Sequence, residues 1–293
     1  MGILKNLYTR PAKAVTGLGI AGGVAGLAAG TARQIKAVEK FLSMPDKYPA
    51  NDISDDMYND LTASMGLNTP KYVLNDQDAE LLGLVNNAGY YPKHSIKQWV
   101  DEGYGDEIFP GTDRPIRDFV DTGVILASGN QNTLNTLAHE LGHASDDKYS
   151  KIYLRDGKIP KLGMYGSVAT ALLSPLTILG LRRLGIKKLP NTLITAGTIT
   201  APSLAANIYD GYQIVKDEED ANENGEKGLN AIRDKYKDQL PDYFDEAWDA
   251  EREAALDTYK NQHYFTNSVL PVAGGLTMAG ISNGIAKNLK RLL

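Results

Sequence analysis

The pentapeptide HELGH at residues 139–143 constrains the fold of this 293-residue chain more than any other feature. Residues four apart on an α-helix lie on the same face, so His139 and His143 can each direct an imidazole nitrogen at one metal ion. Zinc accepts neutral imidazole, and a catalytic zinc site keeps one position for water. Glu140 can reach that water as a general base without binding the metal. The pattern H-E-x-x-H therefore predicts a catalytic zinc site on a helix.

The residues before the motif agree with this interpretation. The run GVILASG at 123–129 is apolar and β-branched and ends in Ser-Gly, which predicts a short strand. Apolar residues then recur at helical spacing from Leu134 to Leu141, and we expect Asn130 or Asn132 to cap this helix. In a chain of this composition, chance would produce the motif only about 0.002 times.

A third protein ligand is needed, and the histidines do not supply it. A metzincin would carry a histidine six residues beyond His143, but Tyr149 stands there. His94 and His263 have no partner at ligand spacing, and His94 is interpreted as a surface residue. The remaining common solution is a carboxylate from a later helix.

The best candidate for that later helix is the stretch at 243–262, which combines good helix formers with apolar residues at helical spacing. It carries Glu246, Glu251 and Glu253. We expect one of these carboxylates to bind the metal. The earlier charge run at 216–227, KDEEDANENGEK, is interpreted as a solvated loop or helix end.

HELGH followed much later by a helical E-R-E-A resembles the gluzincin metallopeptidases, above all the membrane-embedded group that includes HtpX and the CAAX prenyl proteases. In that group the third ligand is the first Glu of an E-x-x-A-D-x-x-A pattern. The resemblance implies Glu251 as the ligand, with Ala255 in place of the family aspartate. An alternative register uses Glu253, with Asp257 as that aspartate. The resemblance also implies Zn²⁺ as cofactor and a protein or peptide as substrate.

Four stretches of the chain contain no charged residue, and each is long enough to cross a bilayer as a helix. All are rich in Gly, Ala, Ser and Thr, and the first has glycines at G-x-x-x-G spacing, which favours helix association and a homo-oligomer. These stretches are 14–32, 162–181, 189–209 and 264–286.

Charge is distributed unevenly around these stretches. The net charge of −5 argues against a nucleic-acid partner, and the absence of cysteine excludes a thiolate zinc site. All 36 Asp and Glu lie within 33–161 and 210–263, whereas the two tails and the link at 182–188 carry only Lys and Arg. The positive-inside rule then predicts an integral membrane protein with both termini cytoplasmic and the catalytic domain on the opposite face. In HtpX-like enzymes the catalytic part is usually cytoplasmic.

The expected fold is α+β and mostly helical: a zincin-like catalytic domain with a small sheet beside the HELGH helix, plus about four transmembrane helices. Two alternatives stay open, because 14–32 could be a signal peptide and the 162–209 hairpin could be buried core. The expected parts are an N-terminal tail with the first transmembrane helix (1–32), the zincin-like domain (33–161), a transmembrane hairpin (162–209), a helical segment carrying the third ligand (210–263), and a fourth transmembrane helix with a basic C-terminal tail (264–293).

The predicted function is that of a membrane-anchored zinc metalloendopeptidase, in which Glu140 takes a proton from zinc-bound water. We expect the strand at 123–129 to be an edge strand that pairs with an extended substrate. Candidates for stabilising the oxyanion are His263, Tyr259 and Arg252. The alternative is a non-enzymatic membrane or virion structural protein in which the metal site is structural or vestigial.

Overall fold

The computed structural model of the chain describes residues 53–85, 87–146, 158–185 and 191–261, with single positions between 21 and 39 and between 272 and 279. The chain divides into two compact units. Unit 1 comprises Met1–Val38, Asp156–Gln213 and Asp257–Leu293, and unit 2 comprises Glu39–Arg155 and Ile214–Leu256.

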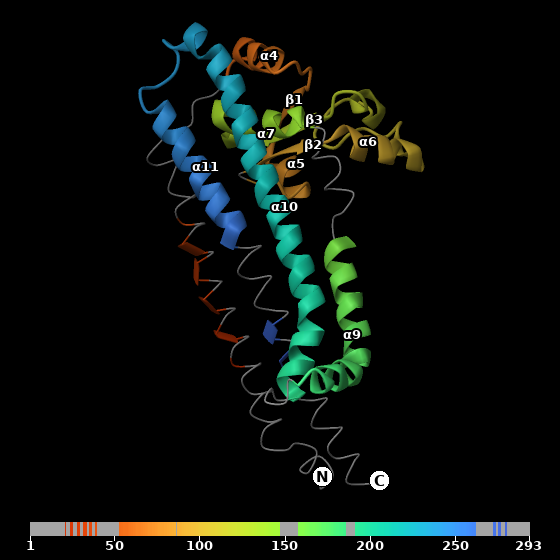
Figure 1. Cartoon of the computed structure of the whole chain (residues 1–293). Helices are drawn as coiled ribbons and strands as arrows, with labels where there is room; N and C mark the ends of the chain where they lie inside the picture. Colours follow the sequence, from red (N-terminus) through yellow and green to blue (C-terminus); the bar gives the residue numbers. More distant parts are fainter. Residues whose placement is uncertain are drawn as a thin grey trace. The chain divides into compact units, whose positions relative to one another are not determined.

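A three-stranded sheet of spatial order β1-β3-β2 lies in unit 2 (Figure 1). β1 (Lys71–Leu74) is parallel to β3 (Val124–Ser128), and β2 (Ala88–Tyr91) is antiparallel to it. The strand expected at 123–129 is thus β3, but it is the central strand and its five residues are all buried. The prediction that this strand is an edge open to a substrate is wrong, because β1 and β2 already pair with both of its sides.

Both faces of the sheet are covered, which explains why the sequence of β3 is apolar without alternation. Ile125 and Ala127 face a core that includes residues of α4 (Asp55–Ser64) and α7 (Leu134–Ser145). On the other face, Val124 and Leu126 pack in a second core with aromatic residues. The elements around that second core are α5 (Asp76–Leu81), α6 (Lys93–Trp99), η1 (Val100–Tyr104) and η2 (Ile116–Phe119), and η3 (Gly129–Gln131) follows β3.

The helix α7 carries the HELGH motif and packs on the sheet. Its N-cap is Thr133, whose hydroxyl accepts a hydrogen bond from the backbone N–H of Thr136, rather than the expected Asn130 or Asn132. Nine of its twelve residues are buried, because the sheet lies on one side of the helix and other helices of unit 2 lie on the other.

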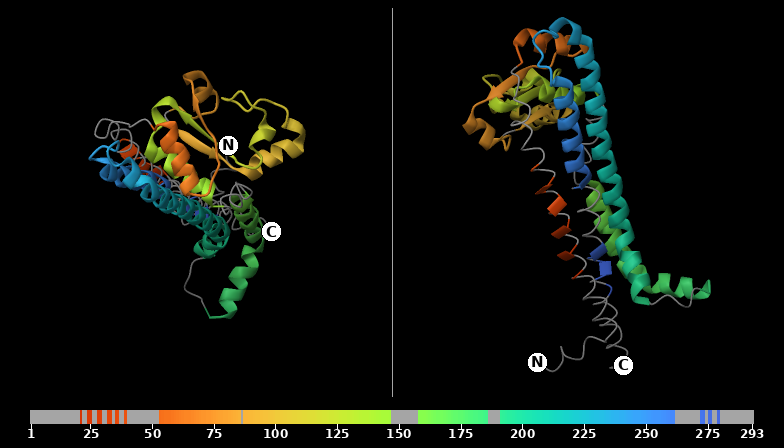
Figure 2. Two further views of the ribbon diagram at one scale, coloured as in Figure 1. Left: turned by 90° about the horizontal axis from the view of Figure 1, so that it is seen from above. Right: turned by 90° about the vertical axis from the view of Figure 1, so that its left-hand side faces the viewer.

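Two long helices contribute to unit 2 from later in the chain. α10 (Asn191–Tyr236) contributes its residues from Ile214 onward, and α11 (Phe244–Lys260) contributes its residues up to Leu256. Within unit 2 these two segments run side by side (Figure 2), and an ion pair of 2.9 Å between Arg252 and Glu226 joins them.

Among the described residues, no helix is both long and apolar enough to cross a membrane. α9 (Lys158–Arg183) and the first part of α10 are long, but their Gly, Ala, Ser and Thr residues offer too little apolar surface. The predicted spans 14–32 and 264–286 lie mostly outside the described residues. The prediction of four transmembrane helices is wrong. The prediction of an integral membrane protein with cytoplasmic termini and an opposed catalytic domain is wrong with it.

Candidate metal centre

Three side chains of unit 2 bring ligand atoms together. His139 and His143 come from α7, and Glu218 comes from α10. The two Nε2 atoms are 3.1 Å apart, and Glu218 Oε2 lies 3.2 Å from Nε2 of His139 and 3.7 Å from Nε2 of His143. The side chains of His143 and Glu218 are almost fully buried, with 5% and 8% of their surface exposed.

These separations fit a tetrahedral zinc ion. With metal–ligand bonds of 2.0–2.1 Å, two ligand atoms of a regular tetrahedron are about 3.3 Å apart. The observed 3.1, 3.2 and 3.7 Å lie on both sides of that value. Two imidazoles and one carboxylate are also a donor set that zinc uses in catalytic sites, where water fills the fourth position. The residues present therefore fit the metal that the motif predicts.

Electrostatics within the group favour a cation. Burial alone would lower the pKa of His139, but its hydrogen bond with Glu218 and the negative charges of Glu140 and Glu218 raise that pKa to about 9. Burial alone would raise the pKa of Glu218, but the hydrogen bonds and positive charge of the two histidines hold it well below its usual range. A carboxylate that stays ionised when buried is suited to bind a metal ion.

Asn222, one turn after Glu218 on α10, orients the first histidine. Its Oδ1 lies 2.9 Å from His139 Nδ1, and because a carbonyl oxygen only accepts, Nδ1 must carry the proton of that bond. His139 Nε2 is then the nitrogen left for a metal. Asn222 is itself 4% exposed, so this contact is shielded from water.

Two glycines allow α7 and α10 to approach closely enough to share the site. A Cβ added at Gly142 would lie 1.9 Å from the backbone oxygen of Ala221. A Cβ added at Gly225 would lie 2.6 Å from the backbone oxygen of Ala138. The glycine inside HELGH is therefore a packing requirement, since the helix that carries Glu218 and Asn222 lies directly against it.

Glu140 lies at the sheet. Its side chain is buried, and its Oε2 accepts a hydrogen bond of 2.8 Å from the backbone N–H of Tyr90 in β2. The carboxylate that the motif assigns as general base is thus held between its own helix and an edge strand. Its neighbour in sequence, His139, belongs to the set of His139, His143 and Glu218, which we call the metal group. The residue assigned as base is therefore adjacent in sequence to a member of that group.

The expected third ligands lie elsewhere. In the ranges that the structure describes, neither Glu251 nor Glu253 belongs to the group of ligand atoms, which takes its carboxylate from Glu218. Glu251 is half-buried, and burial raises its pKa while a hydrogen bond with Asn135 opposes that rise. Glu253 is exposed. Neither carboxylate is held by the two histidines, whereas Glu218 is.

The sequence contains a signal for Glu218, although we did not expect this residue in the site. Residues 218–225 read E-E-D-A-N-E-N-G, which fits E-x-x-A-D-x-x-A with Asn222 in place of Asp and Gly225 in place of the last Ala. We interpreted this segment as a solvated charge run because its acidic residues dominate its composition. The two small residues of the pattern, Ala221 and Gly225, are the positions that contact α7.

The other predicted residues have different positions. His94, expected at the surface, is half-buried in unit 2. Arg252 is engaged by Glu226 and Asp249, and Tyr259 belongs to unit 1. His263 lies outside the described residues. None of the three oxyanion candidates is thus supported by a contact with the metal group.

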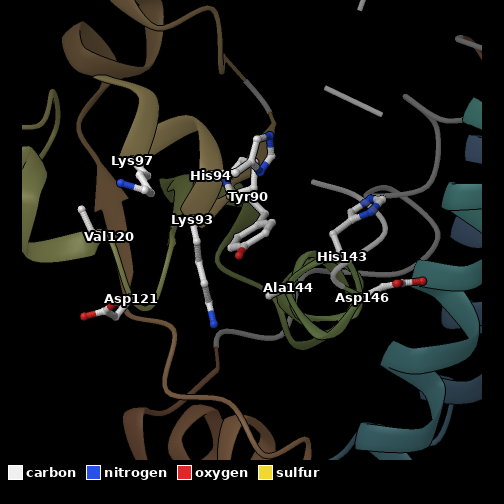
Figure 3. Close-up of a pocket in the computed structure, with 10 residues that line it drawn as sticks. Tyr90, Lys93, His94, Lys97, Val120, Asp121, His143, Ala144 and Asp146 are labelled. Atoms are coloured by element: carbon white, nitrogen blue, oxygen red, sulfur yellow. The ribbon is translucent and has the colours of Figure 1, made fainter. Parts of the chain in front are cut away.

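A pocket of about 310 Å³ opens beside His143 (Figure 3). One side of it is formed by α7 and the residues after it, and the other by β2 and α6. The residues that line it are Tyr90, Pro92, Lys93, His94, Lys97, Val120, Asp121, His143, Ala144 and Asp146.

Comparisons with protein-family models, curated proteins and solved structures found no match for this chain. The assignment of the site therefore rests on its own geometry and chemistry.

Proposed function

We propose that this protein is a zinc metallopeptidase of the gluzincin type, with His139, His143 and Glu218 as zinc ligands and Glu140 as general base. The observation that carries the proposal is the spacing of the ligand atoms, 3.1 to 3.7 Å, across two helices. That spacing accompanies an H-E-x-x-H motif whose glutamate is buried next to the group. A histidine pair without a metal role would not need a buried, ionised carboxylate from another helix.

Each residue has a defined part in peptide hydrolysis. A zinc ion held by the three ligands would supply Lewis acidity to a water molecule and to the scissile carbonyl. Glu140 takes a proton from the attacking water and delivers it to the leaving amine. Asn222 holds His139 with Nε2 directed at the metal, and Glu218 contributes the negative charge of the ligand set.

The outer edge of β2 is the surface on which we place an extended peptide. Ala88 and Tyr90 donate their N–H groups to side chains, to Asn87 Oδ1 at 2.9 Å and to Glu140 Oε2 at 2.8 Å, rather than to β3. In an antiparallel strand the N–H and C=O of one residue point to the same side, so the carbonyls of Ala88 and Tyr90 face outward as well. A substrate strand that donates its own N–H groups to these two carbonyls would lie next to Glu140.

The decisive test is turnover by the Glu140→Gln variant. The amide keeps an oxygen that can accept from the Tyr90 N–H, so the fold and the metal content are expected to stay as in the wild type. We expect the zinc-loaded wild type to cleave a quenched-fluorescent peptide library. The rate in Glu140→Gln should be lower than in the wild type by at least about a hundredfold, since a positioned general base contributes 10²–10⁴ in rate. Glu223→Gln, an exposed glutamate on α10, is the matched control.

Two outcomes would overturn the proposal. Cleavage that survives in Glu140→Gln would remove Glu140 as the base. One tightly bound zinc per chain without cleavage of any peptide, under conditions that keep the protein folded, would indicate a structural metal site in a non-enzymatic protein.

A further inference from the structure

We propose that the pocket beside His143 is a specificity subsite that takes a carboxylate of the substrate, and that Lys93 binds it. In the context of the proposed function, this subsite selects peptides with a negative charge close to the cleaved bond. The binding of the carboxylate itself does not depend on catalysis, so the two proposals can fail separately.

The position of the pocket relates it to the metal group. His143, a member of that group, lines the pocket together with Ala144, and α6 supplies Lys93, His94 and Lys97 from the opposite side (Figure 3). Tyr90 lines it too, and its backbone N–H is the group that holds Glu140. A peptide extended along β2 with its scissile bond at the metal therefore has a side chain or a chain end close to this pocket.

Two lysines and two aspartates line the pocket: Lys93, Lys97, Asp121 and Asp146. Lys97 forms an ion pair of 3.2 Å with Asp101, one turn later. Lys93 has neither an ion pair nor a hydrogen bond with any residue of the described ranges, and it is exposed to solvent. In Figure 3 the carboxylates of Asp121 and Asp146 point away from Lys93, toward opposite sides of the view. Lys93 is thus the lysine of this pocket that has no ion pair in the described ranges, and its pocket is also lined by His143 of the metal group.

The volume of the pocket limits its ligand to a small group. A volume of about 310 Å³ is enough for one side chain of a peptide and too small for a large ligand. The hydroxyl of Tyr90 points toward the side of the pocket where Lys93 lies, which offers a second polar group (Figure 3). Both an acidic side chain and the carboxylate at the end of a chain have the required chemistry, and the test below separates them.

The test uses binding to the zinc-loaded Glu140→Gln protein, which avoids turnover. The probes are acetylated and amidated Ala/Gly hexapeptides with one Glu moved through the six positions, the same set with Gln, and Gln peptides with a free C-terminal carboxylate. Calorimetric titration is expected to find one Glu position, or the free carboxylate, bound about tenfold more tightly than its neutral counterpart, as for a hydrogen bond to a charged group. This preference should weaken with salt because Lys93 is exposed.

The lysine variants decide the assignment. Lys93→Gln, made in the same protein, is expected to reduce the preference for the carboxylate to less than about twofold. Lys93→Glu should instead prefer a peptide with Lys at that position over the Glu peptide. Lys97→Gln, on the same helix and in the same pocket, is the matched control and should keep the preference, because the Lys97 ammonium is engaged by Asp101. Equal binding of Glu and Gln peptides at every position, or an equal loss in Lys97→Gln, would overturn the subsite.

Cleavage of the same peptides by the zinc-loaded wild type, compared with the binding data, distinguishes the two proposals. A wild type that cleaves Glu and Gln peptides equally well would leave the peptidase and remove the subsite. A protein that binds the carboxylate through Lys93 but never cleaves a peptide would leave the subsite and remove the peptidase.

Discussion

In unit 2, α10 and α11 each bring one glutamate toward α7, the helix that carries HELGH. Glu218 of α10 is buried, and Glu251 of α11 is half-buried. Glu218 of α10 meets the two histidines and stays ionised, because their hydrogen bonds and charge hold its pKa well below the usual range. Glu251 of α11 meets the amide of Asn135, one turn before His139, and burial raises its pKa. The contrast teaches that the groups that face a buried carboxylate decide whether it stays ionised and joins a set of possible metal ligands. The quality of the helix that carries it does not decide the matter.

The largest expected effect comes from removing one or the other of these carboxylates. Glu218→Gln should lower the zinc affinity by more than about a hundredfold, since even partners that only orient a ligand are worth 10–100-fold. Glu251→Gln should leave the affinity within a factor of about three, because its amide partner does not bind metal. Competition with a chromophoric chelator measures both values. A loss of zinc in Glu251→Gln alone would reverse the comparison and return the third ligand to α11.

The second prediction concerns the contact that places α10 against α7. Gly142→Ala should destabilise the fold by about 1–3 kcal/mol through overpacking, although alanine is otherwise the better residue in a helix. The added Cβ would meet the backbone oxygen of Ala221 at 1.9 Å, so the helices must separate and zinc affinity should fall as well.

Gly129→Ala is the matched control for this prediction, because a Cβ at that glycine meets nothing within 4 Å. Chemical denaturation monitored by circular dichroism, together with a chelator titration, measures both properties. An unchanged stability of Gly142→Ala would mean that α7 and α10 are not held by this contact.

The approach of His139 to His143 on one helix face could be predicted from the sequence because its information is local. The i, i+4 spacing on a helix fixes which side chains share a face, whatever the rest of the chain does. The strand at 123–129 was predictable for the same reason, since a short apolar run between turn residues indicates a buried strand. Its position at the centre of the sheet was not, because strand order depends on pairing with β1 and β2, which lie far from it in sequence.

The third ligand required information of another kind. Glu251 lies in a helix with a clear apolar pattern, whereas Glu218 lies in a strongly acidic segment that composition alone marks as solvated. The feature that distinguishes Glu218 is the pair of small residues Ala221 and Gly225, which permit close packing. Their role becomes apparent only in the structure, where the backbone of Ala221 lies against Gly142 and Gly225 lies against the backbone of Ala138.

The uncharged segments misled for a related reason. A stretch of Gly, Ala, Ser and Thr lacks charge, but lack of charge is not hydrophobicity, and α9 and α10 do not reach the apolarity of a membrane span. In α9 the same small residues make close contacts within unit 1 instead, as where a Cβ at Gly163 would lie 2.6 Å from the Cβ of Ala206.

The third prediction sharpens the comparison at Asn222, the residue that distinguishes α10 from α11 beside the histidines. Asn222→Ala should lower zinc affinity about 10–100-fold, because His139 loses the acceptor that directs its Nε2 at the metal. Asn222→Asp keeps an acceptor and should restore the affinity to the wild-type value or above it. If Asn222→Ala binds zinc as the wild type does, the hydrogen bond is structural only.

The fourth prediction concerns the pH dependence of metal binding. In the metal-free protein Glu218 raises the pKa of His139 to about 9, so zinc must displace a proton from His139 at neutral pH. The apparent affinity should therefore rise about tenfold per pH unit from pH 7 toward pH 9. The stability of the metal-free protein should change in the opposite direction. A raised histidine pKa stabilises the fold at pH values below the ordinary pKa of histidine. That contribution is lost as the pH rises through about 9.

Chelator competition at pH 7, 8 and 9 measures the affinity, and denaturation of the metal-free protein at the same pH values measures the stability. Glu251→Gln should reproduce both slopes, because its carboxylate does not face the histidines. A flat affinity profile in the wild type would mean that His139 is already neutral at pH 7. In that case Glu218 would not be paired with His139, and the difference between the two glutamates would have to come from burial alone.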